Sequence, residues 1–261
     1  FASFSNASIV DGENASASRR DAASSPRRDD MSCVTQCPFR PLNQQVDLGT
    51  PLAYTVTVTR PITALKGPAK GSWYKCYAIL DIYSRYVTGW LVAAAEDAVV
   101  AKDFLDDAMN RNGSQPHTIH ADRGGAMVSK PVSELLVDLR VTRSHSRPRT
   151  SNENSYSEAQ FKTLKYMPDF PDRFGSLEDA RAFCDGFFMA YNHEHRHSGI
   201  GMHTPASAHF GIAEQIRAQR QITLNQAYAE HPERFTRRPR PPKLPEAAWI
   251  NRPADQPTPV L

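Results

Sequence analysis

Two acidic residues, Asp122 and Glu158, have the spacing and the chemistry of a metal-binding pair, with 35 residues between them. Carboxylate oxygens are the ligands that hard divalent cations such as Mg²⁺ prefer. Two such cations about 3.5–4 Å apart can activate the attacking oxygen and stabilise the leaving oxygen of a phosphodiester. This chemistry needs no nucleophilic side chain, and no Ser/His/Asp or Cys/His triad is evident in the sequence. The pair therefore suggests metal-dependent phosphodiester chemistry.

Each acid also has a purely structural interpretation. Asp122 precedes Arg123-Gly124-Gly125 and can close a strand through an Asx-type turn. Glu158 follows Ser155 at the spacing of a capping box, in which its carboxylate would accept from a backbone N–H. Position alone leaves Asp122 open between the two interpretations, and spacing alone favours a helix cap for Glu158.

Basic residues surround Glu158 in the sequence: Arg143, Arg147 and Arg149 precede it, and Lys162 and Lys165 follow it. The two lysines stand at i+4 and i+7 and share its helix face. They fit either a solvated face with a Glu158–Lys162 ion pair or a surface for nucleic-acid phosphates. The nearness of the three arginines favours the second interpretation, so all five are candidate DNA-binding residues.

Alternating strands and helices are predicted around these residues. The hydrophobic pattern predicts strands at 55–59, 73–81, 84–93, 117–121 and 141–146, and helices at 96–111, 131–139, 155–167 and 176–193. Tight connections make the first three strands antiparallel, whereas the last two arrive through helices and are parallel to part of the sheet. This order predicts an α/β fold with a mixed five-stranded sheet flanked by helices. Asp122 then lies at the carboxyl end of a strand, where such folds expose catalytic side chains.

Three regions differ in composition. Residues 1–50 are rich in Ser, Ala, Asn, Arg and Asp without a periodic pattern, which predicts disorder. Residues 51–211 have the pattern of the core, and 212–261 form a basic, proline-rich extension. A net charge of +3 is compatible with a polyanionic partner without requiring one. The sequence has no apolar run of about 18 residues, so no membrane span is expected. We expect a cytoplasmic protein.

Two other groups have metal-ligand side chains. Cys33 and Cys37 form a close pair without a nearby histidine, so reduced thiols are expected rather than zinc. His193, His195 and His197 alternate just before Gly199. Without an identifiable third ligand for a zinc site, these histidines are expected to pack a helix end.

Four segments together resemble insertion-sequence transposases with the retroviral-integrase (DDE) catalytic core: ILDIYSRYVTGW (79–90), HADRGG (120–125), NSYSEAQFKTLKY (154–166) and FMAYNHEHRHSGIGMHTPASAHFG (188–211). The resemblance implies a ribonuclease-H-like fold, a three-carboxylate site, two Mg²⁺ or Mn²⁺ ions, and DNA cleavage with strand transfer. It makes Asp122 the second acid and Glu158 the third, which replaces the capping interpretation. The implied partners are DNA element ends and target, a further copy of the chain and a separate helix-turn-helix protein, in a bacterial, nucleoid-associated setting.

The first acid departs from the family pattern. A segment of the form Trp-x-x-Asp-Ile-Thr is expected where this chain has Thr59-Arg60-Pro61-Ile62-Thr63. Pro61 stands at the aspartate position, binds no metal and interrupts a strand. We therefore expect a transposase core with impaired catalysis, left by a frameshift or degradation of the copy, unless Asp47 or Asp81 supplies the missing ligand. The competing functions are an active transferase, a non-catalytic DNA-binding remnant, and a nuclease of related fold, which the Asp–Glu spacing disfavours.

Overall fold

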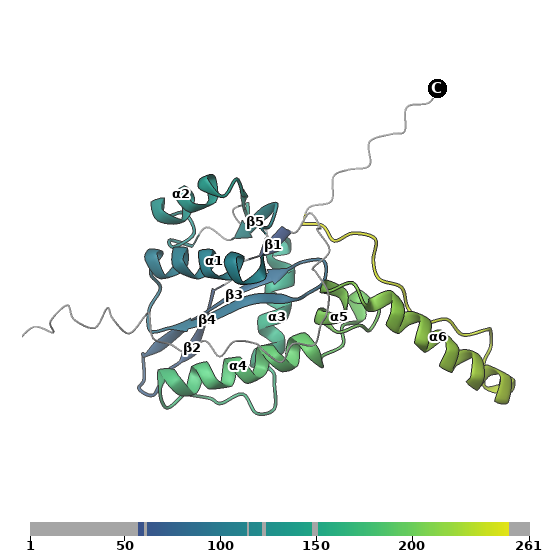
Figure 1. Ribbon diagram of the computed structural model, residues 1–261. Helices are drawn as coiled ribbons and strands as arrows, with labels where there is room; N and C mark the ends of the chain where they lie inside the picture. Colours follow the sequence, from purple (N-terminus) through teal and green to yellow (C-terminus); the bar gives the residue numbers. More distant parts are fainter. Residues whose placement is uncertain (1–56, 60–61, 114, 122–123, 148–150, 251–261) are drawn as a thin grey trace, which may run out of the picture. The chain divides into compact units, whose positions relative to one another are not determined.

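The computed structural model describes residues 57–59, 62–113, 115–121, 124–147 and 151–250 (Figure 1). The chain divides into two units, 1–46 and 47–261, and all described residues belong to the second. Several residues singled out in the sequence lie outside the described part: Cys33, Cys37, Asp47, Pro61, Asp122 and Arg149. The division into 1–50, 51–211 and 212–261 stays a prediction.

The sheet is mixed, as predicted, but has six strand segments instead of five. They are β1 (Thr57–Thr59), β2 (Ile62–Lys66), β3 (Trp73–Asp81), β4 (Val87–Ala93), β5 (Thr118–Ala121) and β6 (Thr142–His145). Strand β3 pairs antiparallel with β4 on one side and with both β1 and β2 on the other. Strand β1 pairs parallel with β5, and β5 parallel with β6.

The first predicted strand, 55–59, corresponds to β1, and β2 is a further segment that was not predicted. Thr59 pairs with Leu80, and Ile62 pairs with Tyr77, so β1 and β2 keep one register along β3. Residues 60–61 lie outside the described residues. Both segments pair with β3, so the described sheet has six strand segments where five strands were predicted.

Helices cover both faces of the sheet (Figure 1). They are α1 (Ala98–Asn112), α2 (Lys130–Asp138), α3 (Ser155–Lys165), α4 (Leu177–His193), α5 (Pro205–His209) and α6 (Ala213–Glu230), with 3-10 turns at Ser151–Asn154 (η2), Ser198–Ile200 (η3) and Pro232–Arg234 (η4). Helices α1 and α2 share one hydrophobic cluster, and α3 and α4 share the other. No helix within the described part is both long and apolar enough to cross a membrane.

Strand β3 contributes side chains to both clusters. Tyr77 and Ile79 belong to the cluster of α1 and α2, whereas Cys76 and Ala78 belong to that of α3 and α4. Successive side chains of a strand point to opposite faces, so a strand buried on both sides serves two cores. Phe188 of α4 is fully buried in the second cluster. Burying a side chain of this size contributes about 1.5–3 kcal/mol.

Local signals set several element ends. Ser176 caps α4 by accepting from the Asp179 N–H at 3.0 Å. Gly113 ends α1 in the left-handed region, with φ 61°. The predicted strand at 84–93 starts only at Val87, because Asp81 begins a turn in which the Arg85 N–H donates to the Asp81 carbonyl at 2.9 Å.

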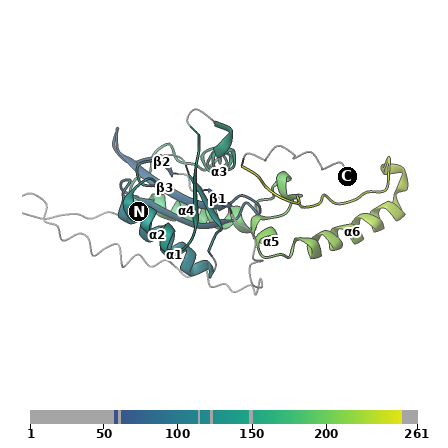
Figure 2. The same ribbon diagram turned by 90° about the horizontal axis from the view of Figure 1, so that it is seen from above.

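The chain returns to the core after α6 through a segment that we call the C-terminal strap, residues 235–250 (Figure 2). Near its start, the Phe235 ring meets the Tyr228 ring of α6 at 5.7 Å between centroids. Gly201 has φ 65°, and a Cβ there would lie 2.7 Å from the Lys243 carbonyl oxygen, so only glycine allows this approach. Near its end, the Tyr156 hydroxyl of α3 donates to the Trp249 carbonyl at 3.2 Å.

Candidate active site

The parallel strands β1, β5 and β6 bring their carboxyl ends to one edge of the sheet. Thr59 pairs with His120, and His120 pairs with Ser144. His120 and Ala121 of the HADRGG motif therefore lie at this edge at the end of β5, and Asp122 lies outside the described residues. Catalytic side chains of α/β proteins collect at such edges.

Glu158 is the fourth residue of α3, and its side chain is exposed. The capping box does not form: α3 begins at Ser155 itself, and its N-cap, Asn154, makes no side-chain cap hydrogen bond. Among the described residues Glu158 has no ion pair with Lys162 either. The two structural interpretations of Glu158 are therefore not realised, and its carboxylate stays accessible at the start of the helix.

Helix α3 presents two distinct faces. Phe161 and Leu164 are buried in the cluster that α3 shares with α4. Glu158, Lys162 and Lys165 are exposed on the other face, as the heptad-like spacing predicted. The buried face holds the helix against the sheet, so the acidic and basic groups face outward together.

A hydrogen-bonded chain connects the sheet edge to the start of α3. Buried His120 approaches Ser144 Oγ with Nδ1 at 3.0 Å and Ser146 Oγ with Nε2 at 3.1 Å. Ser146 Oγ then donates to Asn154 Oδ1 at 3.1 Å. Asn154 immediately precedes α3, so these bonds position the helix that carries Glu158. Sequence reasoning missed this role of His120, since the partners come from a different strand.

A buried carboxylate, Glu153, stabilises the segment between β6 and α3. Only 1% of its side chain is exposed, and it accepts from the Arg147 backbone N–H and from Arg147 Nε, each at 2.6 Å. Hydrogen bonds to a charged group are shorter and stronger than neutral ones. Sequence reasoning treated Arg147 as a candidate for DNA alone, and nothing in the local pattern singled out Glu153.

The candidate DNA-binding arginines have different surroundings. Arg143 of β6 is exposed and donates to Ser133 Oγ of α2. The Arg147 side chain is 68% exposed despite its bonds to Glu153. Arg149 lies outside the described residues. Arg143 and Arg147 are thus held toward α2 and toward η2 respectively, and both keep exposed surface.

Asp81 is committed to a buried network and does not face solvent. Its carboxylate accepts from the Ser84 hydroxyl at 2.5 Å and from the Tyr83 N–H at 3.0 Å, and His209 Nδ1 lies 3.3 Å from it. Burial by itself raises the pKa of Asp81, but the hydrogen bonds from His209 and Ser84 outweigh it and leave the pKa below its ordinary value. Asp81 is therefore no substitute for a missing metal ligand.

The same three side chains are also not a hydrolytic triad. In a triad the serine and the aspartate contact opposite nitrogens of the histidine ring. Here Ser84 Oγ and the Asp81 carboxylate both approach Nδ1 of His209, at 3.2 and 3.3 Å, and Ser84 donates to Asp81 directly. All three residues are buried. We refer to Asp81, Ser84 and His209 as the α5 lock, because they hold α5 to the β3–β4 turn.

Two of the three alternating histidines, His195 and His197, pack at the end of α4, whereas His193 is exposed. The Tyr191 ring stacks on His195 at 5.7 Å between centroids and meets the edge of His197 at 4.9 Å. Burial, followed by the charges of His195 and Arg85, lowers the pKa of His197 to about 4. An aromatic cluster with a neutral His197 therefore terminates the helix.

The metal-ligand side chains of the described residues are not grouped into a metal site. In this part of the chain, no group of three or more His, Cys, Asp or Glu is placed to hold a metal ion. Glu96 reaches the turn after Asp122, where its carboxylate accepts from the Ala126 N–H at 3.4 Å. A pocket of about 500 Å³ lies at the same sheet edge, with His120, Arg147, Glu153 and Trp249 among its lining residues.

Comparisons with known proteins agree with this architecture. Two family models, both described as an integrase core domain, match residues 57–151 and 139–205, which together exceed half of the chain. The transposase InsF of insertion sequence IS3A from Escherichia coli (strain K12) is 30% identical over 135 residues, 51% of this chain and 47% of the relative. A transposase of element IS904 from Lactococcus lactis is 24% identical over 131 residues, 48% and 51% of the two chains. The chain thus spans about half the length of the curated relatives that it matches.

Solved structures of retroviral integrases also resemble the chain. The catalytic core domain of BIV integrase aligns with a TM-score of 0.47 and 17% identity, over 62% of this chain and 98% of that one. The HTLV-2 integrase catalytic core domain in complex with magnesium aligns with a TM-score of 0.44 and 16% identity, over 61% and 99%. The two family models together cover residues 57–205 and place the chain in the integrase core domain family, in which it is similar to insertion-sequence transposases.

Proposed function

We propose that this chain is a transposase core for metal-dependent DNA cleavage and strand transfer, and that Pro61 impairs its catalysis by standing in the place of the first acid. The observation that carries the proposal is the parallel register of β1 and β5. Val58 pairs with Ile119, and Thr59 pairs with His120. Position 61 follows Thr59 by two residues, and Asp122 follows its partner His120 by two residues as well.

An aspartate at position 61 would then stand one strand away from Asp122. Neighbouring strands are about 4.8 Å apart, so two carboxylates at level positions can share a cation. A prolyl side chain offers no oxygen ligand. Glu158, accessible at the start of α3, supplies the third position. Two other buried carboxylates are weaker candidates for a metal ligand. Asp81 accepts a hydrogen bond from Ser84, and Glu153 is paired with Arg147.

The proposed ligands of Mg²⁺ or Mn²⁺ are Asp122 and Glu158, which fit hard cations by chemistry but are one carboxylate short of the family's set. Such ions, when bound, activate the attacking oxygen and stabilise the leaving oxygen in phosphodiester displacement. The protein groups would orient the DNA, with Arg143, Arg147, Arg149, Lys162 and Lys165 contacting phosphates. Element ends and target are the proposed DNA partners, with a second copy of the chain and a separate helix-turn-helix protein in assembly, in a nucleoid-associated setting.

Strand transfer on the cognate element ends, measured with Mn²⁺, tests the impairment. The unmodified chain should give background product, Pro61→Asp should raise it, and Pro61→Asp with Glu158→Gln should abolish the gain. Robust turnover by the unmodified chain would overturn the proposed impairment. Calorimetric titration with Mn²⁺ gives a second readout, in which Pro61→Asp should bind measurably tighter than the unmodified chain, and an unchanged titration would count against the register argument.

The second candidate function is a non-catalytic DNA-binding remnant with the same core, and Pro61 itself favours it. The two candidates separate in the Pro61→Asp chain. If that variant binds DNA and Mn²⁺ but transfers no strand, the remnant interpretation stands. If it gains strand transfer, the loss of activity is confined to position 61.

A further inference from the structure

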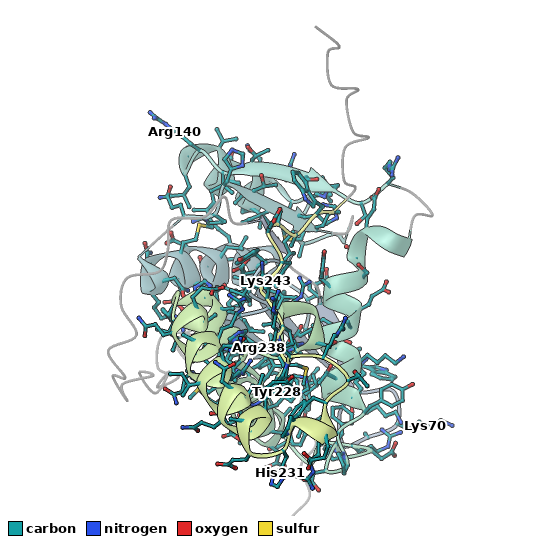
Figure 3. The ribbon with its side chains drawn as sticks, turned by 90° about the vertical axis from the view of Figure 1, so that its right-hand side faces the viewer. Lys70, Arg140, Tyr228, His231, Arg238 and Lys243 are labelled. Carbon is teal, nitrogen blue, oxygen red and sulfur yellow. The ribbon has the colours of Figure 1, made fainter. Side chains whose placement is uncertain are left out.

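The C-terminal strap carries a dense run of positive charge. Between positions 235 and 243 it has four basic residues and no acidic one: Arg237, Arg238, Arg240 and Lys243. All four are exposed. Figure 3 shows Arg238 and Lys243 along the strap beside α6, and Lys70 and Arg140 at separate edges of the protein. The strap is therefore a basic surface that the core elements do not cover.

Covalent geometry keeps this run extended. Pro239, Pro241 and Pro242 have φ restricted to about −65°. The residues before prolines, Arg238 and Arg240, are pushed toward extended backbone as well. Such a chain approaches a polyproline II helix, which has three residues per turn and rises about 3.1 Å per residue. Its side chains therefore point outward in fixed directions.

Contacts with α6 and α5's neighbouring loop hold the strap in place. Gln221 Nε2 donates to the Pro239 carbonyl at 3.2 Å, and Arg238 donates to Asn225 Oδ1 at 3.4 Å. The Lys243 carbonyl packs against Gly201. These contacts involve backbone carbonyls and the Arg238 side chain, and they do not involve the other basic side chains of the strap. The strap is thus ordered before any partner arrives, which lowers the entropic cost of binding.

Arg237, Arg240 and Lys243 recur every third residue, so they follow one edge of the strap. With about 3.1 Å per residue, neighbouring charges are roughly 9 Å apart along it. In the described part of the chain none of the three side chains makes a hydrogen bond or an ion pair. Arg220 differs, because its guanidinium donates to the carbonyls of Gly201 and Met202. The three strap residues are free for an external polyanion.

The direction of the strap links this charge to the candidate active site. After Lys243 the strap continues to Trp249, whose carbonyl accepts from Tyr156 of α3. Residues 246–250 line the pocket at the sheet edge together with His120 and Arg147. The basic edge therefore leads along the strap to the part of the core that contains His120 of β5 and the start of α3.

We propose that the edge formed by Arg237, Arg240 and Lys243 binds the phosphate backbone of duplex DNA and directs the duplex toward the candidate active site. The proposal rests on the proposed function, since it takes DNA as the polyanion. Regular, preordered cations suit a regular row of phosphates and carry no sequence preference. Contacts of this kind release counterions, so each one adds to the salt dependence of binding.

The test compares two triple variants of the full chain that lose the same charge. The strap variant is Arg237→Gln, Arg240→Gln, Lys243→Gln, and the control is Lys70→Gln, Lys130→Gln, Arg140→Gln, whose three positions are exposed and lie outside the strap. Fluorescence anisotropy with a labelled duplex in EDTA measures the dissociation constant at several salt concentrations. Circular dichroism checks that each variant folds, and Arg237→Glu, Arg240→Glu, Lys243→Glu provides a stronger perturbation.

Loss of three phosphate contacts should reduce the steepness of a plot of log association constant against log salt concentration by about 2.7. Over a fourfold rise in salt, the unmodified chain should lose about 40-fold more affinity than the strap variant. The control should keep the slope of the unmodified chain. Equal slopes for the unmodified chain and both strap variants would overturn the strap proposal and leave the proposed function standing. If the unmodified chain binds no duplex at any salt, the DNA step of the proposed function fails as well.

Discussion

The α5 lock should couple Asp81 and Ser84 energetically. Asp81 is 1% exposed and Ser84 is fully buried, and the Ser84 hydroxyl donates to the Asp81 carboxylate at 2.5 Å. A hydrogen bond to a charged group contributes about 1.5–3 kcal/mol, and an unsatisfied buried group costs about as much. Asp81→Asn keeps an acceptor for the Tyr83 N–H but replaces one acceptor oxygen by a donor facing Ser84 or His209.

We expect Asp81→Asn to lower the free energy of unfolding by about 2–4 kcal/mol and Ser84→Ala by about 1.5–3 kcal/mol. Their double mutant should lose at least about 1 kcal/mol less than the sum, because the two single changes remove one shared bond. Urea unfolding followed by tryptophan fluorescence, with linear extrapolation, measures all four corners of the cycle. Additivity within about 0.5 kcal/mol would refute the coupling.

The same cycle has a defined pH dependence. The pKa of Asp81 in the folded chain lies below its ordinary value of 3.8, so the ionised carboxylate stabilises the fold above that value. This contribution is lost as the pH falls through the folded-state pKa. Asp81→Asn should therefore bring the least additional destabilisation at the acid end. A constant difference from the unmodified chain across the acid range would contradict the assignment.

The remaining predictions concern the end of α4 and the start of α3. Burial, with the charges of His195 and Arg85, depresses the pKa of His197 to about 4 in the folded chain. In the unfolded chain His197 takes up its proton near pH 6.5, so the folded state loses stability as the pH falls from 6.5 toward 4. His197→Phe should flatten the unfolding free energy over this window, and an unchanged slope would contradict the neutral ring. Glu153→Gln should cost about 1–3 kcal/mol, since Glu153 is buried on Arg147, and hydrogen exchange should quicken at the start of α3. Unchanged exchange there would mean that Glu153 does not position the helix.

Local sequence features determined much of the secondary structure. The aromatic and apolar run WYKCYAILD predicted β3 with its observed bounds, 73–81, because such residues are typical of strands. The predicted helices 96–111 and 176–193 correspond to α1 and α4, whose ends are set by Gly113 and Ser176, since capping depends on a few neighbouring residues.

The candidate site was less accessible from sequence. The spacing of Asp122 and Glu158 left open whether either acid was structural, and the resemblance to transposases assigned their roles. Local pattern favoured a capping box at Glu158, yet α3 begins at Ser155 and leaves that carboxylate exposed. The α5 lock was invisible in sequence, since Asp81 and His209 are 128 residues apart.

Only the tertiary structure decided how distant segments meet. The register of β1 against both β3 and β5 places Thr59 between Leu80 and His120. The burial of Glu153 on Arg147 and the return of the strap to Tyr156 likewise depend on packing between elements. Propensities and caps act over a few residues, whereas these contacts form only when the whole sheet and its helices exclude water together. The sequence by itself therefore determined the elements and the family, and the tertiary structure decided which side chains stay free to act.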